Sequence, residues 1–277
     1  MRFDRFITLA LGQPLRRAGS GAWRLPILMY HGISDVPEAA GAGYYQTNTR
    51  PEVFRRQLEV LAELGYRTFE LAQALARLRE PGPAGEKCVV ITFDDGFRNF
   101  YVDAFPALQT HGFTATVFLP TAFIGEPRRA FKSAECLTWA EVRELRQHGI
   151  GFGSHTVSHP ELERLSRPEI ERELRVSKSE LEERLGEPVT TFAYPFAFPQ
   201  HDREFTRRLR KMLGEAGYAC CATTELGRVR PGDDPFRLKR LPVNSLDDPA
   251  LFRAKLEGAY DWMAWPQWVF KWVKSHP

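Results

Sequence analysis

Short apolar runs alternate with longer amphipathic segments along most of the chain. The clearest run, at 88–93, is rich in β-branched residues, which is typical of a strand buried on both faces of a parallel sheet. The strands that such runs predict lie at 26–30, 88–93, 115–119, 151–154, 189–194, 218–222 and 241–243. Between the runs, apolar residues recur at helical spacing. The helices that this spacing predicts lie at 51–64, 71–78, 101–111, 139–148, 168–185 and 203–215.

Local signals at the helix ends support these ranges. Thr138 and Glu141 have the spacing of a capping box at the start of the helix at 139–148. Ser166 precedes the long helix at 168–185, and a glycine follows it. The repeated strand–helix alternation, with polar residues at strand ends, predicts an α/β fold with a parallel sheet.

The chain contains no internal repeat and no linker long enough to divide it, so one main domain is predicted. Residues 1–24 are rich in Arg and Gly and are expected to form an irregular N-terminal arm. Residues 25–245 hold the strand–helix alternation and are expected to form the main domain. Residues 246–277 are expected to form a helical, Trp-rich tail.

The amino-acid composition gives no sign of a nucleic-acid-binding protein or of a disulfide-rich one. Hydrophobic residues make up 43% and charged residues 26%, with a formal net charge of +3 and no block of like charge. This is typical of an ordinary globular protein and gives no support to nucleic-acid binding. The four cysteines do not form a disulfide framework or a C-x-x-C zinc motif, which favours a reducing compartment.

The N-terminal apolar patch is too short for a signal peptide, and no stretch has the length of a membrane span. We therefore expect a cytoplasmic protein, with peripheral contact at the inner face of the membrane as a further hypothesis.

Two adjacent carboxylates follow the apolar run at 88–93. Asp94 and Asp95 would lie at the carboxyl end of the strand, where parallel α/β sheets and barrels keep their active sites, and Gly96 permits the turn. Taken alone, Asp-Asp-Gly is equally consistent with a turn that simply closes a strand.

A second polar group follows the predicted strand at 151–154. His155 and His159 are four residues apart, a spacing that places both rings on one face of a helical turn. Two histidines with one carboxylate from Asp94-Asp95 would form a metal site with room for water, the catalytic rather than the closed structural pattern. Zinc is the default ion for this set, and cobalt, nickel or iron would also fit.

The sequence resembles the polysaccharide deacetylase family, carbohydrate esterase family four, whose domain is called the NodB homology domain. T-F-D-D-G at 92–96 and H-T-V-S-H at 155–159 carry the resemblance, which extends from residue 25 to residue 245. Further matching segments are I-L-M-Y-H-G at 27–32, F-R-R-Q-L-E-V-L-A-E-L-G-Y at 54–66 and F-A-Y-P-F at 192–196. The first two of these resemble the branch that contains poly-N-acetylglucosamine deacetylases. The resemblance implies a distorted (β/α) barrel.

The resemblance also implies roles for individual residues. Asp95, His155 and His159 would hold one divalent metal ion, and Asp94 would be the general base that takes a proton from water. The substrate-binding positions would be Tyr194, Pro195 and Phe196, and the backbone N–H near Phe196 would help to hold the oxyanion.

The sequence departs from the family pattern at two motifs. The L-x-H motif is replaced by L-K-R at 238–240, so the general acid would come from the early Tyr-His-Gly segment, which indicates His31. The R-x-P-Y motif reads A-Y-P-F at 193–196, so its arginine is absent. Arg240 is only a weak candidate for orienting Asp94 in its place.

The tail holds four of the six tryptophans within 262–274, together with Lys271 and Lys274. It would either pack against the barrel or act as an interfacial anchor for a membrane.

The resulting prediction is a metal-dependent deacetylase. It would hydrolyse the N-acetyl group of an amino sugar in a polysaccharide, oligosaccharide or lipid-linked glycan. Release of formyl or of an O-acetyl group would suit the same site. The alternative is a non-catalytic carbohydrate-binding protein that retains the barrel.

Overall fold

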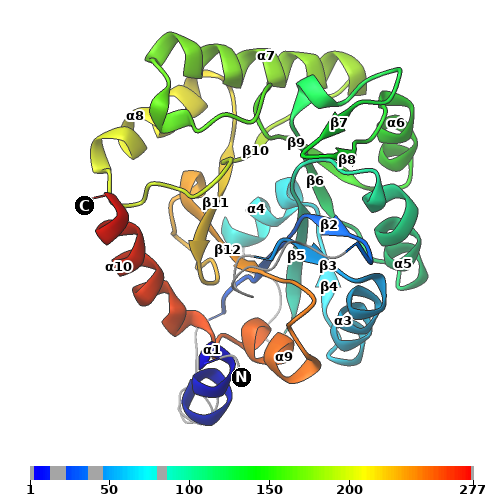
Figure 1. The fold of residues 1–277 in the computed structure, drawn as a ribbon, viewed down its shortest axis with the longest axis vertical. Helices are drawn as coiled ribbons and strands as arrows, with labels where there is room; N and C mark the ends of the chain where they lie inside the picture. The colour runs from blue at the N-terminus through cyan, green and yellow to red at the C-terminus, as the bar shows by residue number, and fades with distance from the viewer. Residues whose placement is uncertain (1–2, 13–22, 37–45, 80–85, 276–277) are drawn as a thin grey trace.

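The fold is a closed barrel of parallel strands surrounded by helices, shown in a computed structural model that describes residues 3–12, 23–36, 46–79 and 86–275 (Figure 1). The strands follow one another around the barrel in the order β1 (Ile27–Tyr30), β12 (Leu238–Pro242), β11 (Cys220–Leu226), β10 (Thr191–Ala193), β9 (Gly151–Ser154), β6 (Thr116–Leu119) and β5 (Cys88–Phe93). The barrel closes because β1 pairs with β12 on one side and with β5 on the other. The predicted α/β barrel is therefore confirmed.

Several shorter strands lie outside this closed ring. The short β4 (Arg67–Thr68) pairs with the start of β5 outside the closed ring. A parallel pair, β2 (Gly32–Ile33) and β3 (Asn48–Thr49), lies beyond the end of β1. An antiparallel pair, β7 (Ala130–Phe131) and β8 (Ala134–Glu135), lies in the loop between β6 and β9.

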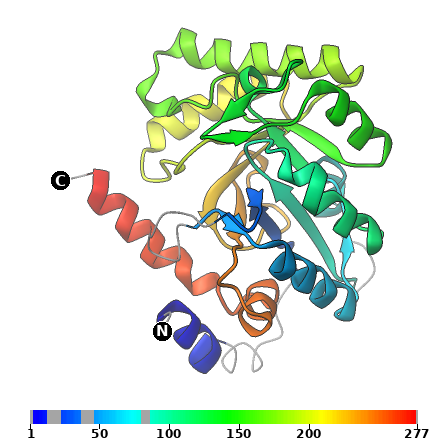
Figure 2. The ribbon, with the colours of Figure 1, turned by 45° about the vertical axis from the view of Figure 1, so that its right-hand side comes forward.

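Helices cover the outside of the barrel (Figures 1 and 2). The α-helices between successive strands are α3 (Pro51–Glu63), α4 (Leu71–Arg79), α5 (Phe105–Thr110), α6 (Trp139–Gln147), α7 (Arg167–Leu185) and α8 (Arg203–Glu215). A π-helical turn, η3 (Phe100–Ala104), precedes α5, and 3-10 turns occur at η4 (Thr121–Phe123), η5 (Leu162–Arg164) and η6 (Pro235–Arg237). The capping box at Thr138 and Glu141 is present at α6, and Gly186 ends α7 in a left-handed conformation.

The alternation of side chains along each strand divides the core into an interior and an outer layer. In β5 all six residues are buried. Val89, Ile91 and Phe93 belong to the cluster that packs against α3, α5 and α6, whereas Cys88 and Val90 belong to a second cluster with Ala222 and Leu238 of neighbouring strands. This parity matters for the site, because it places Thr92 and then Asp94 toward the barrel interior.

Some predicted elements differ from the structure. The strand at 241–243 is longer and starts at Leu238, because Lys239 and Arg240 interrupt the apolar run but continue the strand. The strand at 189–194 is reduced to Thr191–Ala193. The prediction of an irregular arm is wrong for residues 3–12, which form α1 (Phe3–Ile7) and a π-helical turn, η1 (Thr8–Gly12).

The C-terminal part is helical. It contains α9 (Pro249–Glu257), the 3-10 turn η7 (Asp261–Met263) and α10 (Ala264–Ser275). The division of the chain at residues 24 and 245 stays a prediction. Among the described residues, no helix is both long enough and apolar enough to cross a membrane.

Candidate active site

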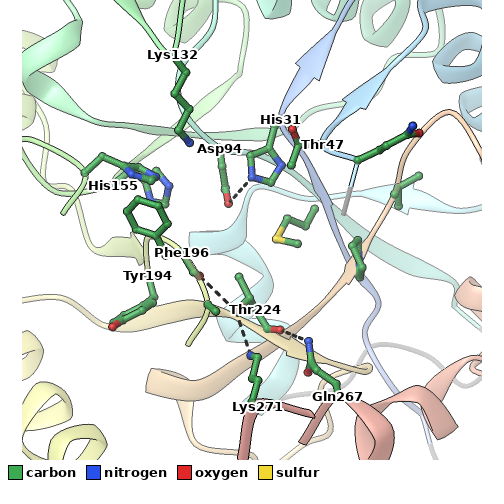
Figure 3. Close-up of a pocket in the computed structure, with 16 residues that line it drawn as sticks. His31, Thr47, Asp94, Lys132, His155, Tyr194, Phe196, Thr224, Gln267 and Lys271 are labelled. Carbon is green, nitrogen blue, oxygen red and sulfur yellow. Dashed lines mark hydrogen bonds and ion pairs between the residues drawn. The ribbon is translucent and has the colours of Figure 1, made fainter. Parts of the chain in front are cut away.

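A pocket of about 370 Å³ lies at the carboxyl ends of the barrel strands (Figure 3). Asp94 and His155 follow the last residues of β5 and β9, and His31 follows β1. Because all strands of the ring are parallel, their carboxyl ends meet at one rim, where residues far apart in sequence become neighbours.

The turn after β5 separates the two carboxylates. Asp95 has φ of 70° and Gly96 has φ of 61°, so the chain reverses direction directly after Asp94. A Cβ on Gly96 would lie 2.7 Å from Leu119 Cδ2, which explains the need for glycine there. Asp94 and Asp95 are 3% and 1% exposed, so neither belongs to a simple surface turn. The structure thus disfavours the hypothesis that Asp-Asp-Gly only closes a strand.

Arg240 holds Asp94. The guanidinium of Arg240 donates two hydrogen bonds to the carboxylate, of 2.7 Å to Oδ1 and 2.8 Å to Oδ2. Arg240 is itself 1% exposed and also donates to the Thr92 hydroxyl and to the carbonyl oxygen of Thr223. These contacts fix the position of the Arg240–Asp94 ion pair. The sequence analysis treated Arg240 as only a weak candidate for orienting Asp94 and so underestimated its role.

These contacts determine the charge of Asp94. Burial by itself raises the pKa of Asp94, but the charges of Arg240, His155 and His31 more than offset this, so the pKa lies below its ordinary value. Asp94 is consequently an anion at neutral pH.

The structure brings Asp95, His155 and His159 together. One potential ligand atom from each lies within 4.8 Å of the others, and all three side chains are buried. Asp95 Oδ1 is 3.2 Å from His159 Nε2 and 3.7 Å from His155 Nε2. The residues present fit a metal ion, because Asp95 Oδ1 is buried with no hydrogen-bond partner.

The tautomer of His155 also suits a metal ligand. His155 Nδ1 lies 2.8 Å from the carbonyl oxygen of Ala193 and donates to it, which leaves the lone pair on Nε2 facing Asp95. Burial lowers the pKa of His155 to about 4, so the ring is neutral at pH 7.

The helical turn predicted for residues 155–159 is wrong. Thr156 and His159 have φ of 70° and 55°, which a right-handed helix does not allow. Glu173 of α7 stabilises this tight turn by accepting hydrogen bonds from the backbone N–H groups of Val157 and Ser158. Sequence reasoning missed Glu173, whose role depends on the packing of α7 beside the turn.

Lys132, at the tip of the β7–β8 hairpin, was also missed. Its ammonium lies 3.0 Å from Asp95 Oδ2, and Figure 3 shows the side chain reaching into the pocket from above. Lys132 thus places a positive charge beside Asp95, the carboxylate of the candidate metal-ligand group. No sequence signal near the two motifs indicated this hairpin.

His31 lies on the side of Asp94 that faces away from His155 (Figure 3). Its Nε2 is 3.9 Å from Asp94 Oδ2 (Figure 3). Burial lowers the pKa of His31 below its ordinary value, and the charges of Asp94 and Asp95 oppose this shift. The ring is therefore mostly neutral at pH 7 in the free site and is placed to exchange a proton with groups in the pocket.

The predicted substrate-binding residues occupy different environments. Tyr194 and Phe196 line the pocket, whereas Pro195 is buried and does not line it. Phe196 has φ of 59° and is 46% exposed, and its ring lies 4.6 Å from that of His159.

One wall of the pocket comes from α10, which lies far from the motifs in sequence. Gln267 donates to the carbonyl oxygen of Thr224 (Figure 3). Lys271 donates to the carbonyl oxygen of Phe198. Burial lowers the pKa of Lys271 to about 8. The sequence offered only the tryptophans and lysines of the tail as signals, not its position at the pocket.

Comparisons with known proteins agree with this geometry. The sequence profile described as polysaccharide deacetylase matches residues 81–221. The Bacillus subtilis (strain 168) protein YxkH, a candidate polysaccharide deacetylase, is 31% identical over 84% of this chain and 76% of its own length. The Escherichia coli (strain K12) poly-beta-1,6-N-acetyl-D-glucosamine N-deacetylase is 32% identical over 47% of this chain, a match that spans only 20% of that protein.

Solved structures show the same fold. The Streptococcus pyogenes deacetylase PplD, in complex with acetate, superposes with a TM-score of 0.73 at 26% identity and covers 84% of this chain and 98% of PplD. IcaB from Ammonifex degensii superposes with a TM-score of 0.70 at 23% identity, over 84% of this chain and 97% of IcaB.

Proposed function

This chain belongs to the polysaccharide deacetylase family, and from that premise we propose that it is a metal-dependent hydrolase that removes the N-acetyl group from an amino sugar of a glycan. One observation carries the proposal: a buried Asp95, His155 and His159 group lies directly beside an Asp94 that Arg240 keeps ionised. This combination supports the assignment of a ligand set for a Lewis acid beside a general base.

Asp95, His155 and His159 would hold the ion, with zinc as the default and cobalt, nickel or iron as alternatives. A divalent ion held there supplies polarisation of the amide carbonyl and acidification of water.

Asp94 is assigned as the general base. Its carboxylate accepts the proton of the attacking water, whose oxygen forms a bond to the carbonyl carbon. Arg240 fixes both carboxylate oxygens, so the proton acceptor is held in place before the substrate binds. The backbone N–H of Phe196 is assigned to stabilise the negative charge on the former carbonyl oxygen.

His31 is assigned as the group that protonates the leaving nitrogen. When the carbon–nitrogen bond breaks, the amine needs a proton. His31 lines the pocket, and its Nε2 lies 3.9 Å from Asp94 Oδ2. Because His31 is mostly neutral in the free site, it first has to receive a proton. Asp94 supplies the proton that it took from water, and His31 then passes this proton to the leaving nitrogen. Acetate and the free amine are the products.

The substrate class rests on the relatives. Poly-beta-1,6-N-acetyl-D-glucosamine N-deacetylases are among the proteins that match this chain. The alternative of a non-catalytic carbohydrate-binding protein depended on the absent motif arginine and on the absent L-x-H motif. Arg240 supplies a guanidinium to Asp94, which removes the first argument, and the assignment of His31 as the acid answers the second.

The test measures acetate release from N-acetylglucosamine oligomers by the zinc-loaded protein, with and without a chelator. We expect the Asp94→Asn variant to bind zinc like the wild type but to lose at least about 100-fold in rate. The Asp95→Asn variant should lose zinc affinity and activity together. If wild-type protein binds zinc and oligomer but releases no acyl group from any amide or ester tested, the proposed hydrolase is wrong.

A further inference from the structure

The orientation of α10 is inverted relative to that of an ordinary surface helix. Its polar residues Gln267 and Lys271 face the protein, where they bond to Thr224 and Phe198. Gln267 also accepts a hydrogen bond from the backbone N–H of Leu226. A surface helix of a globular protein normally buries its apolar stripe and exposes its polar one.

The outward side of α10 is aromatic instead. Trp265 is 72% exposed and Trp268 is 46% exposed, three residues apart on one face. Further large apolar residues of α10 with high exposure are Phe270 at 47%, Trp272 at 45% and Val273 at 54%. Such a concentration of exposed tryptophan on one helix indicates a surface that contacts something else.

The N-terminal helix α1 shows the same inversion. Asp4 accepts a hydrogen bond of 2.8 Å from the Tyr260 hydroxyl, and in the adjoining η1 the Thr8 hydroxyl accepts one of 3.0 Å from Trp262 Nε1. Phe3 and Phe6, on the outward side, are 75% and 51% exposed. Leu11 in η1 is 57% exposed.

The two helices are neighbours. Tyr260 and Trp262, which contact α1 and η1, lie in the segment that leads directly into α10. Both views show α1 beside the start of α10, on the same side of the barrel (Figures 1 and 2). The exposed apolar residues of α1, η1 and α10 are here called the aromatic face.

We propose that the aromatic face docks on the surface of a lipid bilayer and lies in its interfacial region. Tryptophan is preferred at the membrane–water interface, where its ring is apolar and its N–H can still be hydrated. The first 24 residues contain five arginines and one aspartate, and two of the arginines, Arg5 and Arg24, pair with Asp248 and Asp261. Five arginines against these three aspartates leave an excess of positive charge, which favours anionic headgroups. With 12 residues, α10 is too short to span a bilayer, so it lies in the plane of the interface.

The position of the pocket extends this inference to the substrate. Lys271 and Gln267 of α10 line the pocket, and Trp265 and Trp268 of the same helix do not line it and are 72% and 46% exposed. A bilayer under the aromatic face would therefore lie beside the pocket wall. This inference rests on the proposed function. If the pocket lies beside a bilayer, the substrate class is an N-acylated amino sugar that is carried on a membrane lipid.

The experiment measures flotation of the full chain with vesicles of phosphatidylcholine alone and of phosphatidylcholine with phosphatidylglycerol at about 7:3. We expect binding to the anionic vesicles, weakened by salt. We expect the partition coefficient to fall at least about tenfold in a Trp265→Ser/Trp268→Ser variant and in a Phe3→Ser/Phe6→Ser variant. The matched control is Val102→Ser/Val176→Ser, which removes exposed apolar residues that are 51% and 44% exposed elsewhere and should bind like the wild type.

Three results would overturn the proposal. They are absence of binding to either vesicle, equal binding by the aromatic-face variants, and a stable dimer in vesicle-free solution that those variants dissociate, which would assign the face to a second copy. Circular dichroism and thermal unfolding establish that each variant is folded.

A second readout separates the docking from the chemistry. The aromatic-face variants should lose at least about tenfold in rate on N-acetylglucosamine linked to polyprenyl phosphate in vesicles, but stay within about twofold of the wild type on water-soluble oligomers. Equal losses on both substrates would contradict the substrate class. The Asp94→Asn variant should float like the wild type, so a failure of the proposed hydrolysis leaves the docking result readable.

Discussion

Arg240 and Asp94 form a buried, two-point ion pair, although they lie 146 positions apart in the sequence. Arg240 lies on β12 and Asp94 follows β5, and β1 lies between these two strands. Bidentate arginine–carboxylate pairs are strong because both hydrogen bonds are charge-assisted. The pair connects the integrity of the barrel to the ionisation of the residue assigned as the base.

Removing the guanidinium should therefore affect both stability and rate. In an Arg240→Gln variant, Asp94 stays buried without its counter-charge, so we expect a loss of about 3–5 kcal/mol in the free energy of unfolding and a raised pKa of Asp94. Urea unfolding and acetate release check this. Arg240→Lys should be intermediate, because it keeps the charge but loses the second hydrogen bond.

A matched control is Arg56→Gln, which removes an arginine from exposed ion pairs with Glu59 and Glu63, where the arginine side chain is 49% exposed. It should change the free energy of unfolding little, because solvent screens exposed ion pairs. Equal stability of Arg240→Gln and wild type would show that the buried pair is not needed to keep Asp94 in place.

Substitution of His31 should be sensitive to the leaving group. A His31→Gln variant should lose about 100-fold or more on an N-acetyl amide, because the amine cannot leave without a proton. On a 4-nitrophenyl acetate ester the loss should be much smaller, since the phenolate leaves unprotonated. Steady-state rates on both substrates test this, with His111→Gln on the outer surface as the control. Equal losses on amide and ester would contradict the assignment of His31 as the acid.

Lys132 should weaken metal binding. Its ammonium lies 3.0 Å from Asp95 Oδ2, and its side chain is 46% exposed. The ammonium therefore competes electrostatically with a cation at the same carboxylate. We expect Lys132→Met to bind zinc about three- to tenfold more tightly, measured by competition with a chromophoric chelator. Lys132→Arg keeps the charge and should resemble the wild type. Weaker zinc binding by Lys132→Met would show that the lysine supports the site instead.

The cysteines should be unreactive in the native protein. All four are free and buried, and burial raises the pKa of Cys88 to about 11 and the pKa of Cys136 and Cys220 to about 12. Because the thiolate is the reactive form, a raised pKa lowers the reactive fraction at pH 8. Ellman's reagent should therefore detect almost no thiol quickly at pH 8 and four after denaturation. Rapid labelling of the native protein at pH 8 would contradict the burial of these side chains.

The sequence by itself determined the strand–helix alternation and the position of the two polar motifs. Apolar runs and helical spacing are local patterns, so β5, β6 and β9 and the helices between them could be predicted from neighbouring residues alone. The polar residues that follow β5 and β9 are equally local, and their resemblance to a known family indicated Asp94, Asp95, His155 and His159 as candidate site residues. The helical turn at 155–159 was wrong because the spacing of two histidines does not determine backbone conformation.

Only the tertiary structure decided which distant residues complete the site. Barrel closure brings Arg240 to Asp94, the packing of α7 brings Glu173 to the histidine turn, and the β7–β8 hairpin brings Lys132 to Asp95. The inversion of α10 is similarly invisible in sequence, because a Trp-rich amphipathic helix has the same pattern whether its aromatic side faces a core or solvent. Local periodicity determines which face of an element is apolar, but contacts between elements determine what that face meets.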